Sequence, residues 1–176
     1  MSITDTRFLA CEPFTLKEEG GNSDDAHDPG GRTHDGIIQR ECDAWRKAHD
    51  EPLIDVYNLS DAERDEIYYA QYWLPNCPNV PPGLDLCLFD DGVNTGPVEA
   101  VKFLQTALGV TADGHFGVIT AGALKAAPSI PRLIVAFTAA REAYYRSLRT
   151  FRYFGKDWIG RSQRCEAAAL KMASGA

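Results

Sequence analysis

The chain has 176 residues, 44% of them hydrophobic, and its formal net charge is −7. A chain of this size can bury one sizeable core, so we expect one domain, or one domain with a small appendage. No apolar run approaches the roughly 18 residues that a membrane-spanning helix needs, so stable membrane insertion is not expected.

The charge is unevenly distributed. Residues 1–129 contain 9 basic and 22 acidic side chains, whereas residues 130–176 contain 9 basic and 3 acidic ones. The acidic part argues against a nucleic-acid-binding protein, which needs a dense basic surface. The basic stretch could contact an anionic polymer, or it could be a solvated helix face that balances the acidic part.

Five cysteines are scattered along the chain without CxxC spacing: Cys11, Cys42, Cys77, Cys87 and Cys165. This pattern indicates neither a zinc site nor a dense disulfide framework. We expect small, apolar core residues in a protein that is made in a reducing cytosol.

Helical spacing dominates the first half of the chain, and no segment alternates convincingly with a period of two. The first helix is expected over residues 5–18, where Pro13 should kink or break it. The second helix is expected to contain Ile37, Ile38, Cys42 and Trp45. The sequence Ser60-Asp61-Ala62-Glu63 is a capping box that predicts the start of a third.

In the next part of the chain, proline and glycine residues indicate where helices begin and end. Residues 77–83 form a proline-rich break, and residues 84–93 should form a short buried helix. Pro97 suits the start of the following helix and Gly109 its C-terminal cap. These two residues therefore predict the limits of one helix.

The remaining segments are also expected to be helical. A turn over residues 111–117 precedes a short helix, and residues 131–149 are expected to form the longest helix. A final helix should begin near Asp157. The sequence thus predicts a mostly α fold in which residues 20–36 form one long irregular loop.

Long irregular loops in compact domains are often functional. A calcium site is not indicated, because the aspartates of residues 24–28 do not fall at the alternating positions of a calcium loop. The glycine pairs do not match a phosphate-binding motif. A zinc site is conceivable from four side chains, namely His27, Asp28, His34 and Asp35. Zinc-binding histidines usually lie at i and i+4 on a rigid helix, which is not the spacing here.

A carboxylic acid at the end of the first helix is another candidate. Glycines beside it would allow a bulky substrate to approach the backbone. An apolar environment would keep such a carboxyl group protonated near neutral pH. Glu18 and Glu19 both satisfy this description, and helical spacing alone does not separate them.

One motif pair resembles a known family. Glu19-Gly20-Gly21, followed by DPGGRTHDGI at residues 28–37, resembles the start of glycoside hydrolase family 108. These are lysozyme-like N-acetylmuramidases, found as phage endolysins and in a bacterial toxin-secretion system. The similarity continues through Tyr72-Trp73 and LFDDGVNTGP at residues 88–97. Residues 104–117 and RTFRYFGKDWIGR resemble the predicted peptidoglycan-binding region that commonly follows the catalytic part.

The resemblance implies a lysozyme-like, mostly α fold. It implies a catalytic region over residues 1–96 and a helical, predicted peptidoglycan-binding region over residues 97–176, packed into one compact unit. The implied activity is cleavage of the β-1,4 bond between N-acetylmuramic acid and N-acetylglucosamine in peptidoglycan. Glu19 would be the general acid, and no cofactor is expected.

The resemblance supplies one catalytic residue, Glu19, and four further residues are candidates for substrate binding. Asp28 or Thr33 would hold a water molecule or the sugar ring on the side opposite Glu19, although Asp28 could instead be a turn residue that caps the loop. Tyr72 and Asn94 would contact substrate N-acetyl groups, or could be a core phenol and a buried amide. The expected partner is a peptidoglycan glycan strand, bound by a monomer.

The sequence is also compatible with two other functions. The protein could bind peptidoglycan without cutting it, as a wall-binding or secretion accessory protein, or it could be a metal-dependent hydrolase that uses His27 and His34. The N-terminus MSITDTRFLACEPF lacks the apolar segment of a secretory signal. We therefore expect synthesis in the cytoplasm and action in the periplasm or cell wall, after release through a holin or a secretion system, or as part of a virion.

Overall fold

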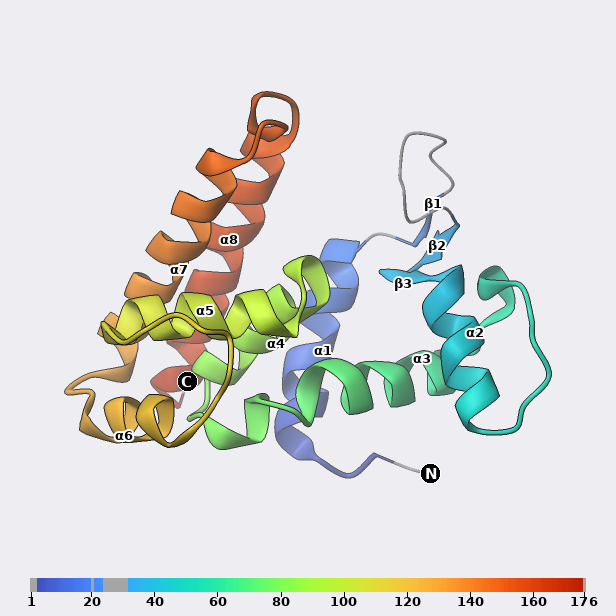
Figure 1. The fold of residues 1–176 in the computed structure, drawn as a ribbon, viewed down its shortest axis with the longest axis horizontal. Helices are drawn as coiled ribbons and strands as arrows, with labels where there is room; N and C mark the ends of the chain where they lie inside the picture. Colours follow the sequence, from blue (N-terminus) through green and yellow to red (C-terminus); the bar gives the residue numbers. More distant parts are fainter. Residues whose placement is uncertain (1–2, 20, 24–31, 176) are drawn as a thin grey trace. The chain divides into compact units, whose positions relative to one another are not determined.

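The computed structural model describes residues 3–19, 21–23 and 32–175. The chain forms two compact units, Met1–Gln71 and Tyr72–Ala176 (Figure 1). Both are built mainly from helices, which confirms the prediction of a mostly α, lysozyme-like fold. The boundary between the two compact units lies between residues 71 and 72. The predicted boundary between a catalytic and a peptidoglycan-binding region lies between residues 96 and 97, and this functional boundary stays a prediction.

The described residues of the first unit form a small sheet and three α-helices. The helices are α1 (Thr6–Glu19), α2 (Gln39–Ala48) and α3 (Asp61–Tyr68), with a 3-10 turn η1 (Val56–Asn58) before α3. The strands are β1 (Asn22–Ser23), β2 (Thr33–His34) and β3 (Ile37–Ile38).

Helix α1 continues through Pro13, so the expected break does not occur. The side chain of Asp5 accepts hydrogen bonds from the backbone N–H groups of Arg7 and Phe8, which fixes the start of the helix. A proline removes the hydrogen bond to the carbonyl group four residues earlier. That carbonyl belongs to Leu9, whose side chain is exposed, so this side of the helix is open to water.

Within residues 20–36, which the sequence predicts to be an irregular loop, β1 and β2 belong to a three-stranded antiparallel sheet in the order β1-β2-β3. His34 pairs with Ile37, so only Asp35 and Gly36 form the turn between β2 and β3. Both turn residues have positive φ angles, 45° and 78°, as a two-residue hairpin turn requires. The prediction of a helix over Ile37 and Ile38 was therefore wrong, because these residues form β3 and α2 begins at Gln39.

Polar contacts fix α2 and α3 within the first unit. Arg46 donates two hydrogen bonds to the carboxylate of Glu63, at 2.6 and 2.7 Å. The hydroxyl oxygen of Ser60 accepts a hydrogen bond from the backbone N–H of Glu63, which confirms the predicted helix cap. The start of α3 is thus fixed both by its own cap and by a side chain from α2.

The second unit contains five α-helices. They are α4 (Leu84–Thr95), α5 (Pro97–Leu108), α6 (Val118–Ala126), α7 (Ile130–Ser147) and α8 (Phe151–Ala173). A π-helical turn η2 (Tyr69–Trp73) leads into this unit, and a 3-10 turn η3 (Cys77–Asn79) precedes α4. Gly109 has a φ angle of 71° and caps α5, which confirms both predicted limits of that helix.

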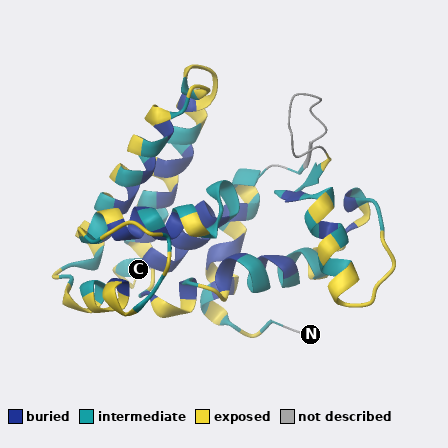
Figure 2. Cartoon of the chain, viewed as in Figure 1, coloured by how far each residue is buried: buried dark blue, intermediate teal, exposed yellow. Residues whose placement is uncertain are grey.

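Helix α4 is the central element of the second unit. It contacts α5, α7 and α8, and residues 84–92 are all buried (Figure 2). The prediction of a short buried helix in this segment is confirmed. Its buried side chains include three aspartates, Asp85, Asp90 and Asp91, whose charges must be compensated inside the unit.

The longest helix is α8, with 23 residues, and not α7, which has 18. The final helix begins at Phe151 and not near Asp157, so both predictions were wrong. Helix α8 continues through Gly155, a residue type that weakens helix interiors. A side chain at residue 155 would lie 2.6 Å from the ring of Phe151, so the glycine leaves room for this ring on the helix surface.

All five cysteines are free and buried, which confirms that they are core residues. No helix in the described part of the chain is long and apolar enough to cross a membrane.

Candidate active site

Glu19 is the last residue of α1 and is half-buried. Its carboxyl oxygen Oε1 is shielded from solvent. The end of α1 thus presents a carboxyl group that is partly shielded from water.

The other carboxyl oxygen of Glu19 lies against the hairpin turn. A Cβ atom placed on Gly36 would lie 2.8 Å from Oε2 of Glu19 and 3.1 Å from the hydroxyl oxygen of Tyr68. The carboxylate of Glu19 and the hydroxyl group of Tyr68 therefore both lie close to the backbone of Gly36, which has no side chain. Gly36 is needed here for two reasons, since its φ angle is 78° and any side chain would collide with the carboxylate.

Two side chains of α3, one helical turn apart, hold this hairpin turn. The hydroxyl group of Tyr68 donates a hydrogen bond to the backbone carbonyl oxygen of Asp35. Arg64 donates a hydrogen bond of 3.0 Å to the carboxylate of the same residue. Residues four apart lie on one face of a helix, so α3 contacts the turn through both its backbone and its side chain.

Arg64 also bonds two aspartates of its own helix. Its guanidinium group lies 3.0 Å from Asp61 and 2.8 Å from Asp65. Although burial opposes its charge, these carboxylates and Asp35 raise the pKa of Arg64. The imidazole of His34 lies 3.7 Å from the carboxylate of Asp35. The turn beside Glu19 is therefore surrounded by fixed charges.

A second buried carboxyl group lies on α1. Glu12 is 8% exposed, and burial together with a hydrogen bond to Asp65 raises its pKa to about 7. Glu12 precedes Glu19 by seven residues, so the two lie on the same face of α1. Sequence analysis did not identify Glu12. The signal was a lone glutamate between Cys11 and the buried Thr15, on the apolar face of the helix.

The structure describes one of the two residues predicted to act opposite Glu19. Thr33 lies in β2, is half-buried, and pairs with Ser23 on one side and Ile38 on the other. Asp28 lies outside the described residues. The conceivable zinc site also falls partly outside them, and no cluster of metal-binding side chains occurs in the rest of the chain.

Tyr72 and Asn94 belong to the second unit. Tyr72 is 8% exposed, and its backbone carbonyl oxygen accepts a hydrogen bond from the thiol of Cys77. The side-chain oxygen of Asn94 accepts a 2.6 Å hydrogen bond from the hydroxyl group of Tyr145. These contacts suit a core phenol and a packed amide. A role for either residue in substrate binding stays a prediction.

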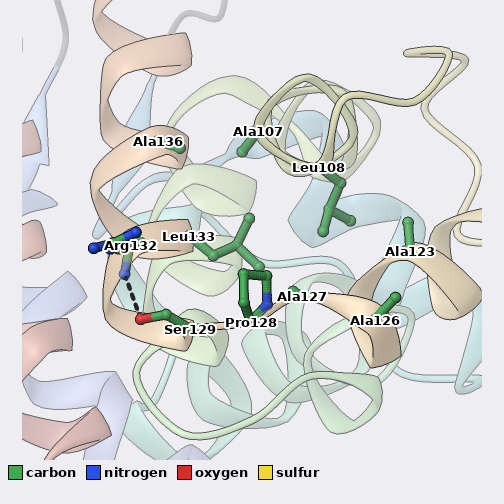
Figure 3. Close-up of a pocket in the computed structure, with 10 residues that line it drawn as sticks. All are labelled: Ala107, Leu108, Ala123, Ala126, Ala127, Pro128, Ser129, Arg132, Leu133 and Ala136. Atoms are coloured by element: carbon green, nitrogen blue, oxygen red, sulfur yellow. Dashed lines mark hydrogen bonds between the residues drawn. The ribbon is translucent and has the colours of Figure 1, made fainter.

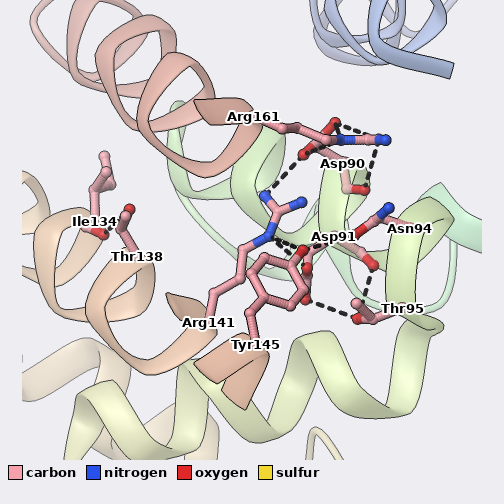
Figure 4. A network of polar contacts seen from close by, with 9 residues as sticks. All are labelled: Asp90, Asp91, Asn94, Thr95, Ile134, Thr138, Arg141, Tyr145 and Arg161. Carbon is pink, nitrogen blue, oxygen red and sulfur yellow. Dashed lines mark hydrogen bonds and ion pairs between the residues drawn. The ribbon is translucent and has the colours of Figure 1, made fainter. Parts of the chain in front are cut away.

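Two arginines of the basic C-terminal stretch are buried and not solvated (Figure 4). Arg141 and Arg161 each form an ion pair of 2.8 Å with the carboxylate of Asp90. Arg141 also lies 2.8 Å from Asp91. The two cations lower the pKa of Asp90 despite its burial, whereas burial and the neighbouring Asp90 raise the pKa of Asp91 to about 6.

A cavity of about 460 Å³ lies between α5, α6 and α7 (Figure 3). Its wall consists largely of alanines, with Leu108, Pro128 and Leu133, and Arg132 at its edge. The side-chain oxygen of Ser129 accepts a hydrogen bond from the backbone N–H of Arg132 and caps α7. None of the lining residues is a carboxylic acid, so the cavity lacks the group needed for acid catalysis.

Comparisons with known proteins agree with this structure. Residues 13–96 match the family Glycosyl hydrolase 108. This match includes Glu19, the hairpin turn and α3. The solved structure of SagA from Brucella abortus superposes with a TM-score of 0.85 at 32% sequence identity, and the match covers 97% of each chain. No curated protein matches the sequence.

The family match and the near full-length structural similarity confirm the assignment that the sequence motifs predicted. They support hydrolysis of peptidoglycan as the class of activity. The chain belongs to the glycosyl hydrolase 108 family, and it is a glycoside hydrolase.

Proposed function

We propose that the protein is an N-acetylmuramidase that hydrolyses the β-1,4 bond between N-acetylmuramic acid and N-acetylglucosamine, with Glu19 as the general acid. The supporting observation is the position of this carboxyl group at the end of α1. One of its oxygens is buried, and the other lies against Gly36 and faces the hydroxyl group of Tyr68. A general acid must be held in a fixed position within hydrogen-bonding reach of the glycosidic oxygen.

In this mechanism Glu19 donates its proton to the glycosidic oxygen as the bond to C1 of N-acetylmuramic acid breaks. The remaining sugar acquires oxocarbenium character. A water molecule then forms a bond between its oxygen and C1 and releases one proton to the solvent. The carboxylate of Glu19 takes up a proton from the solvent and is ready for the next cycle. The products are an N-acetylglucosamine with a free 4-hydroxyl group and an N-acetylmuramic acid with a free reducing end.

Other residues would support this reaction without donating the proton. Tyr68 and Arg64 fix the turn that carries Gly36, so they would keep the space beside Glu19 constant. Thr33, on β2 of the same small sheet, would hold a water molecule or the sugar ring, as would Asp28. The charges around the turn stay in place during the reaction, which lowers the reorganisation that the transition state requires.

Mass spectrometry of the fragments released from purified sacculi tests the proposed bond. A muramidase releases muropeptides with N-acetylmuramic acid at the reducing end. N-acetylglucosamine at the reducing end, 1,6-anhydro sugars or free peptides would instead identify a glucosaminidase, a lytic transglycosylase or an amidase. Any of these three products as the main product would contradict the proposal.

A turbidity assay distinguishes the enzyme from a protein that only binds the wall. Gram-negative cells stripped of their outer membrane should lose turbidity when the wild-type chain is added. A chain that sediments with sacculi but clears no cells would support the non-catalytic alternative. Clearing that stops when a chelator is added would support the metal-dependent alternative with His27 and His34.

We further propose that the protein is made in the cytoplasm and reaches the wall through a holin or a secretion system, or in a virion. A monomer would suffice, because the residues of the proposed site come from one chain. Expression with and without a co-expressed holin tests the first route. Lysis of the producing cells without any holin would contradict it.

A further inference from the structure

The connection between α7 and α8 forms an exposed tip. Figure 1 shows these two helices side by side, with their connection projecting beyond α4 and α5 of the same unit. We define the tip as residues 146–156, which contain four basic residues and no acidic one. In a chain with a net charge of −7, this is a local concentration of positive charge.

Aromatic side chains are exposed at the same place. Tyr153 is 66% exposed and Phe154 is 52% exposed, although both are large rings on the first turns of α8. Phe154 contacts Trp158, which in turn contacts the buried Tyr145. The exposed rings are therefore the outer end of an aromatic row that begins in the core, so their positions are fixed by packing.

The tip also carries exposed basic side chains, one of which contacts a ring. The guanidinium group of Arg152 lies 4.6 Å from the centre of the Tyr153 ring. Arg149 and Lys156 are exposed, and Arg146 pairs with Glu142 at 2.8 Å. Asp157 follows the tip directly. Even when Glu142 and Asp157 are counted, the four basic residues of the tip leave this end of α7 and α8 with a net positive charge.

We propose that this tip binds the surface of a membrane that contains anionic phospholipids. Headgroup phosphates form a continuous negative plane that can contact several cations of a projecting tip at once. Arginine, lysine and tyrosine place a polar end among the headgroups and an apolar part below them, and phenylalanine adds apolar area. The tip would rest in the interface without spanning the bilayer. This inference does not depend on which bond the enzyme cleaves.

The geometry favours a lipid surface over a glycan strand. The planes of the Tyr153 and Phe154 rings are inclined by 61°, with centres 6.3 Å apart, so they do not form one flat platform for sugar stacking. The tip also projects outward, whereas sugar-binding sites are commonly concave. A bilayer interface accepts rings at any inclination and is matched by the charge of the tip.

Flotation of the full chain with vesicles tests the proposal. The chain should float with vesicles of phosphatidylcholine containing about 30% phosphatidylglycerol, and should not float with pure phosphatidylcholine, because the attraction is largely electrostatic. Raising the salt concentration from about 0.05 M to about 0.5 M should abolish most of the binding. Equal binding to both kinds of vesicle, or to neither, would overturn the proposal.

A charge variant locates the binding at the tip. Arg149→Gln combined with Arg152→Gln should weaken binding to the anionic vesicles by about 20-fold, since each basic residue near such a surface contributes about fivefold. The matched control is Lys125→Gln combined with Lys171→Gln, two exposed lysines on α6 and near the end of α8. This control should bind like the wild type. Equal losses in both variants would show a general charge effect and no binding tip.

A second variant tests the rings. Tyr153→Ser combined with Phe154→Ser should weaken vesicle binding by about tenfold, because apolar area is lost from the interface. Val118 and Ile119 on α6 are also exposed apolar residues, so changing both to serine is the matched control. Circular dichroism of every variant checks that the helices are intact.

Binding to purified sacculi distinguishes a lipid-binding tip from a glycan-binding surface. Because the tip lies within the predicted peptidoglycan-binding region, its variants should lose more binding to anionic vesicles than to sacculi. If they lost binding to sacculi and kept binding to vesicles, the tip would be a glycan-binding surface and the proposal would be wrong. If the ring variant did not fold, the charge variant would still decide, because its two arginines are exposed.

Discussion

A carboxylate oxygen of Glu19 occupies the place next to Gly36 where a side chain of residue 36 would lie, only 2.8 Å from the ideal Cβ position. The end of α1 and the turn between β2 and β3 are thus fitted to each other. This relationship gives Gly36 a role that is both conformational and spatial, and the two parts can be separated by experiment.

Gly36→Ala should lower the rate of wall hydrolysis by about 10- to 100-fold, because the new methyl group would push the proposed acid out of position. The matched control is Gly109→Ala, at a similar φ angle of 71° but with no atom within 4 Å of the new methyl group. Both variants should lose about 1 kcal/mol of stability through backbone strain. A fully active Gly36→Ala enzyme would show that Glu19 does not need its present position.

Tyr68→Phe removes the hydroxyl group that bonds the carbonyl oxygen of Asp35. We expect a loss of about 1 kcal/mol of stability and a lower kcat with little change in KM, because the turn beside Glu19 then loses one of the two side-chain contacts from α3. Tyr69→Phe is the control, since the ring of Tyr69 packs edge-on against Phe8 and its hydroxyl group bonds Asp5 before the start of α1. Steady-state kinetics of both variants checks this prediction. Equal kcat values would contradict it.

Glu12 should make the folded protein less stable as the pH rises. Its pKa is about 7 in the folded chain and 4.5 as the ordinary value, so between these two pH values the unfolded chain releases the proton first. The stability linked to its neutral form is present below pH 4.5 and is lost as the pH rises to 7. Glu12→Gln should therefore gain about 1 to 3 kcal/mol at pH 8 relative to the wild type, and little at low pH.

Urea unfolding of the wild type and Glu12→Gln at about pH 5 and about pH 8 measures this difference. The gain should be larger at the higher pH. The same gain at both pH values would show that the carboxyl group of Glu12 does not titrate in this range.

The two neighbouring aspartates of α4 should differ strongly in their contribution to stability. Asp90→Asn leaves the buried cations Arg141 and Arg161 without their shared carboxylate, which should cost about 3 to 5 kcal/mol. Asp91→Asn should cost no more than about 1 to 2 kcal/mol, since the pKa of Asp91 is already raised to about 6. Denaturant unfolding at neutral pH compares the two variants. Equal losses would contradict the central role of Asp90.

Much of the fold could be predicted from sequence where the signal is local. The capping box at Ser60 and the pair Pro97 and Gly109 act through the backbone near them, so the helix limits that they predict agree with the structure. The turn at Asp35 and Gly36 also has a local signal, since an Asp-Gly pair is typical of a two-residue hairpin turn. Helical spacing predicts a helix over Ile37 and Ile38, and this prediction was wrong because the two residues form β3.

The remaining features depend on contacts between distant segments. Arg141 and Arg161 look like members of a solvated basic stretch, and only their partner Asp90, 51 and 71 residues away, makes them core residues. The bond from Tyr68 to Asp35 spans 33 residues in the same way. The packing of the Phe151 ring against Gly155 in α8 is likewise a feature of the folded helix surface.

The most direct test of the central claim is the rate at which Glu19→Gln releases reducing-end N-acetylmuramic acid from purified sacculi, per molecule of folded protein. Glu18→Gln is the control, because the neighbouring residue keeps the same charge change on the same helix end. We predict a loss of about 10² to 10⁴ for Glu19→Gln and a nearly unchanged rate for Glu18→Gln. A fully active Glu19→Gln, or an inactive Glu18→Gln beside it, would contradict the assignment of Glu19 as the general acid.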